Sequence, residues 1–212
     1  MSSSVLYRPA EPRDERRLGE IAFATGYFGD PATRHFPDPA LFADLWVRPY
    51  LTNLKTSFVV EIGGEVQGYL LGAPDPTTYR RAVTATVLRQ VALRLLRGRY
   101  TQPWPGLRYL LRAALHPGPH ADWGMFPAHL HLNLMPGARG RGLSSPLLEL
   151  HLQRLTELGI PGVQLSTTLE NAVALRVYRR HGFVVWGARR TALWTPWLGR
   201  PAVQVVMARP LP

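Results

Sequence analysis

An α/β fold in a single domain is predicted by three features of this 212-residue chain. Segments with strand-like alternation and segments with helical periodicity follow one another over most of its length. Two strand-like segments, 56–62 and 65–73, are joined by Gly63 and Gly64, a pattern typical of a β-hairpin. The length suits one well-buried domain and is short for two. We therefore expect residues 1–212 to form one domain.

Composition and charge narrow the classes of function. The chain contains no cysteine, which excludes disulfides and thiolate catalysis. No apolar stretch is long enough to cross a bilayer, and the N-terminal segment lacks the apolar core of a signal peptide, so we expect a cytoplasmic protein without a membrane partner. The net charge of +11 favours an anionic partner. His, Asp and Glu do not cluster at metal-ligand spacing, so no metal is expected.

The first third of the chain predicts a strand and two helices ahead of the hairpin. Residues 4–10 have the pattern of a short strand, and residues 12–25 that of an amphipathic helix. A second helix is expected over 38–51, with Asp38 as its N-cap and Pro39 in its first position.

Residues 76–121 form an arginine-rich helical insertion between the third and fourth strands. They contain eight arginines and neither Asp nor Glu. Helical patterns over 77–98 and 106–115 flank a breaker at 100–106. Because apolar residues interrupt the arginines at helical spacing, we expect a solvated helix face or a lid over the substrate, and nucleic acid is an unlikely partner.

Strand and helix patterns alternate regularly from residue 128 onwards. Both expected helices end at a glycine, Gly159 and Gly182. The elements expected here are strands at 128–135, 162–167, 183–192 and 202–208, and helices at 141–159 and 171–182.

The stretch "PGARGRGLSSPLL", residues 136–148, lies between an expected strand and an expected helix. Free N–H groups at a helix N-terminus, together with arginine side chains, are suited to bind a phosphate. A Walker loop is excluded because the only lysine, Lys55, lies far away. A dinucleotide fingerprint is excluded because Ser145 stands where its third Gly or Ala belongs. The stretch therefore predicts a phosphate loop of another kind.

Two motifs, in this order, resemble the hallmarks of the GNAT superfamily of acyl-CoA-dependent N-acyltransferases. The first is similar to R/Q-x-x-G-x-G/A, with Ser144 in place of the last Gly or Ala, and consists of Arg139, Gly140, Arg141, Gly142, Leu143 and Ser144. The second is similar to N-x-x-A-x-x-x-Y-x-x-x-G-F and consists of Asn171, Ala174, Tyr178, Gly182 and Phe183. The segments "FVVEIGGEVQGYLLGAPD" and "PAHLHLNLMP" also resemble the acetyltransferase-like domain of the O-linked N-acetylglucosaminidases.

The resemblance implies a fold and a cosubstrate. The fold is a central mixed, mostly antiparallel sheet, splayed between its fourth and fifth strands, with helices on both faces. The cosubstrate is acetyl-CoA, with its pyrophosphate on the loop backbone and its pantetheine arm along the fourth strand, where the amide of Leu134 or Met135 could polarise the thioester carbonyl. Asn171 is a helix N-cap, a pantetheine contact or both. The residues implied to hold coenzyme A are Leu134, Met135, Arg139, Gly140, Arg141, Gly142, Leu143, Ser144, Asn171 and Ala174.

The same resemblance implies a catalytic acid but leaves the base open. Tyr178 would protonate the leaving thiolate, and its alternative role is that of a core aromatic. His129 and His131 share one face of a strand, and a neutral histidine suits a base, but Leu130 occupies the family's usual base position on the opposite face. Asp75 is the other candidate, as a base, an amine-binding carboxylate or a turn residue. We take Tyr178 as the acid and Asp75 or His131 as the base.

The implied function is transfer of an acetyl group from acetyl-CoA to a primary amine of a small molecule or peptide. We expect the protein to act as a monomer or a homodimer. The alternative is a catalytically inactive module that binds acyl-CoA and recognises a ligand. Leu130 and the likeness to the domain of the O-linked N-acetylglucosaminidases favour that alternative.

Overall fold

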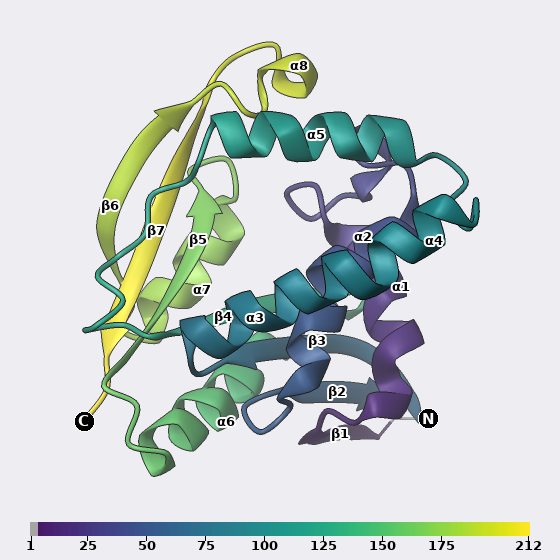
Figure 1. Cartoon of the computed structure of the whole chain (residues 1–212). Helices are drawn as coiled ribbons and strands as arrows, with labels where there is room; N and C mark the ends of the chain where they lie inside the picture. The colour runs from purple at the N-terminus through teal and green to yellow at the C-terminus, as the bar shows by residue number, and fades with distance from the viewer. Residues whose placement is uncertain (1–3) are drawn as a thin grey trace.

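The computed structural model describes residues 4–212, which form a seven-stranded mixed sheet with helices on both faces (Figure 1). The strands lie in the order β1-β2-β3-β4-β5-β7-β6, and every pair is antiparallel except the parallel pair β4–β5. This confirms the expected mixed, mostly antiparallel sheet. The strands are β1 Val5–Pro9, β2 Phe58–Ile62, β3 Glu65–Ala73, β4 Ala128–Leu134, β5 Gly162–Thr168, β6 Val184–Thr191 and β7 Ala202–Pro210.

The helices agree with most of the sequence pattern. Asp38 caps the second helix by accepting a hydrogen bond from Leu41 N at 2.8 Å, but that helix ends at Trp46, short of Pro49, whose missing N–H cannot continue it. The helices are α1 Glu15–Thr25, α2 Pro39–Trp46, α3 Pro76–Thr86, α4 Ala92–Leu96, α5 Pro103–Leu115, α6 Ser144–Glu157, α7 Ala172–Arg180 and α8 Thr195–Leu198. Shorter turns are η1 Pro12–Asp14, η2 Ala32–Arg34, η3 Arg48–Thr52 and η5 Pro136–Ala138, all 3₁₀, and the π-helical η4 Val87–Val91.

Each face of the sheet is covered by its own apolar cluster. On one face, residues of α1 and α2 pack with Tyr69 and Leu71 of β3. On the other face, residues of α6 and α7 pack with Leu70 of β3 and Leu130 of β4. Since neighbouring residues of a strand point to opposite faces, this assigns each side chain of β4 to one side of the sheet.

β4 and β5 separate soon after they begin. They pair only at Ala128 with Val163 and at His129 with Gln164. β5 instead pairs with β7 along its whole length, from Gly162 to Thr168. The strands therefore diverge towards their C-terminal ends (Figure 1), which confirms the expected splay. We call this gap in the hydrogen-bond ladder the β4–β5 opening.

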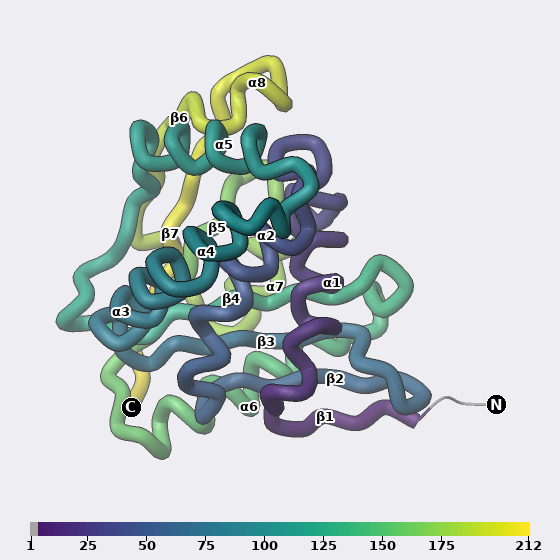
Figure 2. The backbone as a smooth tube through the Cα atoms, turned by 45° about the vertical axis from the view of Figure 1, so that its right-hand side comes forward, coloured from purple at the N-terminus to yellow at the C-terminus, as the bar shows by residue number. Residues whose placement is uncertain are grey.

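The segment between β3 and β4 begins as a single rod of α3, η4 and α4 (Figure 2). Buried acidic residues of the second helix hold it in place. Asp44, whose side chain is 2% exposed, accepts hydrogen bonds from Arg94 NH1 at 2.8 Å and from Tyr100 OH at 2.7 Å. The carboxylate of Asp38, which caps α2, also accepts from Gln102 N at 2.9 Å. Both carboxylates fix the chain between α4 and α5 onto α2.

The far end of this segment is attached to the connection between β6 and β7. Arg112 of α5 donates from Nε to the carbonyl of Leu193 at 2.8 Å and from NH2 to that of Ala192. A cluster of aromatic rings surrounds these contacts and joins the loop after α1, α5 and the β6–β7 connection. Its members are Tyr27, Phe28, His35, Tyr109, Trp194 and Trp197.

Three histidines are held in surroundings that disfavour their charged form. His151 of α6 is fully buried, and its Nδ1 lies 2.7 Å from the carbonyl oxygen of Thr56. It packs so closely on β3 that a Cβ added to Gly72 would lie 2.3 Å from its ring. Burial lowers the pKa of His35, His129 and His151 to about 4.

Acidification is expected to destabilise the protein through these histidines. Their pKa is 6.5 in an unfolded chain and about 4 when folded, so only the unfolded chain takes up protons between these values. The free energy of unfolding is then at its full value above pH 6.5 and falls towards pH 4, by about 1.4 kcal/mol per pH unit for each histidine. Chemical denaturation at a series of pH values measures this slope. His151→Gln keeps a donor for the carbonyl of Thr56. It should lower the slope by the contribution of one proton, about 1.4 kcal/mol per pH unit. An unchanged slope would contradict the lowered pKa of His151.

Candidate active site

The loop that follows β4 exposes a row of backbone donors. We call residues 136–143 the phosphate loop. Gly140 and Gly142 have φ of +73° and +74°, and a Cβ built on either would meet nothing within 4 Å. In the described part of the chain, no acceptor pairs with the N–H groups from Gly140 to Ser144, the first residue of α6. These donors at the N-terminus of a long helix, beside exposed Arg141, can hold an anion.

Arg139 has a different role from its neighbour. Its guanidinium donates from Nε to the carbonyl of Leu134 at 3.1 Å and from NH2 to the carbonyl of Gly29 at 2.5 Å. It therefore shapes the phosphate loop and ties it to the loop after α1, where Phe28 has a φ of +52°. Nothing in the sequence indicated that Gly29 takes part in this region.

The register of β4 decides which of its amides face the β4–β5 opening. Met135 N donates to the carbonyl of Gln67 at 2.9 Å, so this amide is engaged with β3. In an antiparallel pair such residues alternate with residues whose N–H groups point away, which directs the amides of Leu132 and Leu134 towards β5. Because the N–H of Met135 is already bonded, the geometry favours Leu134 of the two expected oxyanion donors. Leu134 stays a candidate, and Leu132 joins it.

α7 carries the second motif at the side of the opening. Asn171 caps this helix, accepting from Ala174 N at 3.2 Å, as one of its two expected roles requires. Tyr178 is 7% exposed and belongs to the same packed cluster as Ala138 and Leu143 of the phosphate loop. Burial raises the pKa of Tyr178 well above its ordinary value. Its phenol keeps its proton at neutral pH, so it is present in the form that can donate a hydrogen bond or a proton.

His131 lies on the opposite face of β4. The β3–β4 register is regular, pairing Leu71 with His131 and Gly72 with Leu130, so no bulge moves Leu130 to this face. His131 is exposed to solvent, yet surrounding protein atoms lower its pKa by desolvation. The imidazole is neutral at pH 7 and can accept a proton.

Aromatic rings form the walls around these histidines. Tyr50 of η3 lies 5.9 Å from His131 and 5.7 Å from His129, measured between ring centroids. Tyr79 of α3 lies 4.4 Å from His129 in an edge-to-face arrangement. Trp123 lies 6.0 Å from His129. Sequence reasoning missed Tyr50, Tyr79 and Trp123, because they come from three segments that only the fold brings together.

Asp75 is the N-cap of α3. It accepts a hydrogen bond from Thr78 N at 2.6 Å, and this bonding lowers the pKa of the exposed carboxylate. A carboxylate so stabilised in its charged form is a weak base. Asp75 precedes Pro76 as Asp38 precedes Pro39, so the capping signal was present in the sequence.

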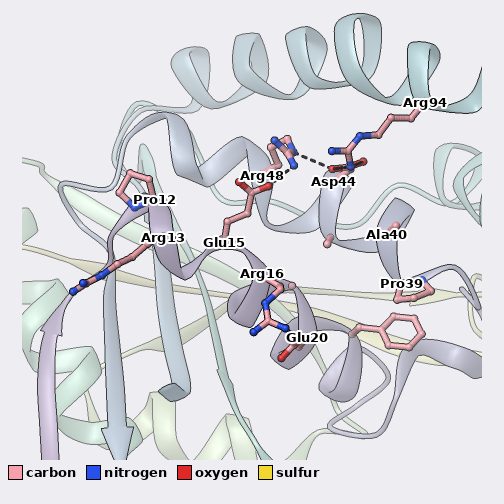
Figure 3. Close-up of a pocket in the computed structure, with 13 residues that line it drawn as sticks. Pro12, Arg13, Glu15, Arg16, Glu20, Pro39, Ala40, Asp44, Arg48 and Arg94 are labelled. Carbon is pink, nitrogen blue, oxygen red and sulfur yellow. Dashed lines mark hydrogen bonds and ion pairs between the residues drawn. The ribbon is translucent and has the colours of Figure 1, made fainter. Parts of the chain in front are cut away.

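Two pockets lie away from the β4–β5 opening. One, of about 700 Å³, is lined by residues of α1 and α2 together with Arg94 (Figure 3). The other, of about 610 Å³, lies between α2 and α4. Neither is lined by a residue of either GNAT-like motif, so the site is assigned from the unpaired donors of the phosphate loop. Residues 4–212 contain no group of three or more His, Asp or Glu that could hold a metal ion, and none of their helices could cross a membrane.

Comparison with known proteins decides the family. The family model described as the acetyltransferase (GNAT) family matches residues 112–183, which include both motifs. The chain contains a GNAT acetyltransferase domain. It is an acyl-CoA-dependent acetyltransferase.

Solved GNAT structures resemble the chain over its whole length. SsHAT is 25% identical, with a TM-score of 0.66 and 98% of each chain covered. An agmatine N-acetyltransferase is 19% identical, with a TM-score of 0.63 and coverage of 98% of this chain and 99% of that one. A phosphinothricin acetyltransferase from Sinorhizobium meliloti, in complex with AcCoA, is 18% identical, with a TM-score of 0.58 and coverage of 100% and 89%.

A carboxylate in the phosphate loop should weaken coenzyme A binding by this acetyltransferase. Gly142→Glu places a negative charge among the donors that are expected to face the pyrophosphate. We expect affinity to fall by at least about tenfold, the loss typical of one charge-assisted contact. Gly159→Glu is the matched control, because Gly159 also has a positive φ (+66°) and open space around its Cβ but follows the other end of α6. Calorimetric titration with coenzyme A compares the two folded variants; equal affinities would refute this placement of the pyrophosphate.

Proposed function

We propose that this protein acetylates a primary amine of a small molecule or peptide by direct attack of the amine on acetyl-CoA. The observation that carries the proposal is the run of unpaired N–H groups at the end of β4, beside two strands that have separated. A pyrophosphate needs such a row of donors, and a peptide-like arm needs strand amides without partners. The family model covers both motifs, one in the phosphate loop and one along α7.

Coenzyme A would be held by backbone rather than by side-chain charge. The N–H groups of 140–144 suit its pyrophosphate, with Arg141 as the exposed cation nearby. The pantetheine amides would pair with Leu132 and Leu134, taking the place that β5 leaves empty. A thioester carbonyl at the inner end of the β4–β5 opening would then accept a hydrogen bond from one of these amides, which stabilises the negative charge that develops on its oxygen.

The acid and the base would act from opposite faces of the sheet. His131 lies on the α1/α2 face and takes a proton from the amine nitrogen as that nitrogen bonds to the carbonyl carbon. Tyr178 lies on the α6/α7 face and gives its proton to the sulfur as the carbon–sulfur bond breaks. The products are the acetylated amine and coenzyme A thiol. The neutral imidazole and the protonated phenol are the forms that these steps need.

Release of thiol tests the activity itself. The protein is incubated with acetyl-CoA and a broad panel of amines, and free thiol is followed over time. Amine-dependent release above the rate of hydrolysis supports acetyl transfer. Tight coenzyme A binding without such release for any amine would favour the inactive recognition module instead. A cytoplasmic location and a monomeric or homodimeric state stay predictions from the sequence.

Removal of the Tyr178 hydroxyl should slow turnover without weakening coenzyme A binding. Tyr178→Phe keeps the ring in its packed cluster, and kcat should fall by about 10²–10⁴-fold, the usual contribution of a general acid. Tyr7→Phe on the edge strand β1 removes a hydroxyl far from the opening and serves as the control. Steady-state kinetics and calorimetry separate the two effects. Unchanged kcat in Tyr178→Phe would assign this residue to the core alone.

The choice of His131 over Asp75 as the base is testable by pH dependence. Desolvation lowers the pKa of His131 below the ordinary histidine value of 6.5. On acidification, kcat/KM should therefore fall only below pH 6.5. His131→Gln should abolish this limb and lower kcat/KM by about 10²-fold or more. Asp75→Asn retains an N-cap for α3 and should leave the acidic limb and the value of kcat/KM nearly unchanged. The reverse pattern, with the limb lost in Asp75→Asn, would transfer the role of base to Asp75.

A further inference from the structure

A pocket between α2 and α4 gathers positive charge that the acetyl-transfer site does not use. It has a volume of about 610 Å³. Its lining contains five arginines and no acidic residue, and consists of Ala40, Arg48, Arg89, Gln90, Leu93, Arg94, Arg97, Arg99 and Tyr100. We call it the arginine pocket. None of residues 134–144 lines it, so it is separate from the phosphate loop.

A buried carboxylate sets the position of two of these arginines. Asp44, with its side chain 2% exposed, accepts from Arg48 Nε at 2.9 Å and from Arg94 NH1 at 2.8 Å (Figure 3). Arg48 also pairs with Glu15. The hydroxyl of Tyr100 bonds to the same carboxylate at 2.7 Å, which fixes the turn after α4. The floor of the arginine pocket is therefore ordered before any ligand arrives.

The other three arginines lack a counter-charge. Within residues 4–212, Arg89, Arg97 and Arg99 form no ion pair and are exposed. Asp44 and Glu15 offset the charges of Arg48 and Arg94 only, so the mouth of the pocket keeps an excess of positive charge. Like charges held close together repel one another, and a bound anion would relieve this repulsion.

We propose that the arginine pocket binds a small anion that carries two or more linked phosphate groups. Guanidinium groups bind phosphate oxygens through paired N–H donors, and several guanidiniums around one concavity suit several phosphates on one molecule. The arginines converge on a single pocket, whereas an extended strand of nucleic acid would call for a row of them along a surface. Leu93 and Tyr100 add apolar surface to the lining, which can contact a non-phosphate part of the ligand.

Calorimetric titration with inorganic tripolyphosphate tests this site. The titration is made in the Gly142→Glu background, in which the phosphate loop should repel added phosphates; coenzyme A is left out because its own pyrophosphate would compete for the arginine pocket. The Gly142→Glu protein should show one saturable site. In the double variant Arg89→Ala/Arg97→Ala, the dissociation constant should rise at least about tenfold, as expected when charge-assisted hydrogen bonds are lost. The control is Arg80→Ala/Arg81→Ala, which removes the same charge from exposed positions of α3 that do not line the pocket and should leave the constant within about twofold.

Further titrations, with ATP and with nucleic acid, identify the class of ligand. ATP in place of tripolyphosphate, if it binds at the same residues, supports the proposal and identifies a nucleotide as the source of the phosphates. Absence of saturable binding to either compound, or equal weakening in both double variants, would overturn the proposal. Tighter binding of single-stranded or duplex nucleic acid, with affinity that falls steeply with salt, would overturn it in favour of a nucleic-acid surface.

Discussion

The separation of β4 from β5 after two residue pairs is the constraint on which the site depends. It leaves amides of Leu132 and Leu134 without a neighbouring strand, although unpaired backbone groups are costly. The cost is tolerable because each strand is held elsewhere: β4 by β3 and β5 by β7, both in continuous antiparallel ladders. The sheet can therefore open at one seam without losing its order. The donors of the phosphate loop and the cap of α7 lie at the two sides of this seam.

The pleat of β4 separates the proposed chemistry into two environments. Side chains of even-numbered residues such as Leu130 enter the cluster beneath α6 and α7, where Tyr178 also lies. Side chains of odd-numbered residues such as His131 face α1, α2 and the aromatic walls. A reaction centred in the opening can thus receive a proton from one side and lose one to the other. Both groups are uncharged at pH 7, and desolvation shifts the pKa of each further from neutrality.

Local signals predicted most of the fold and the family. Capping residues, paired glycines and the order of strands and helices depend on neighbours in the chain, and so do the two motifs. Contacts between distant residues were beyond sequence reasoning. The engagement of Met135 with β3 depends on the register of two strands, and the reach of Arg139 to Gly29 joins residues 110 positions apart. The binding of Arg94 by Asp44 is likewise a contact between distant segments. The capping role of Asp75 was visible in the sequence, but we weighed this residue only as a base, an amine-binding carboxylate or a turn residue.

The bond from Arg139 to the carbonyl of Gly29 joins two parts of the protein that would serve different substrates under the proposed function. One is the loop that follows α1, on the face of the sheet where His131 lies. The other is the phosphate loop, which would hold coenzyme A. A protein engineer who exchanges residues 26–31 for the loop of a relative, in order to accept a different amine, would also remove a support of the phosphate loop. New specificity in this scaffold therefore requires a transplanted loop that still offers a carbonyl oxygen at the place of Gly29.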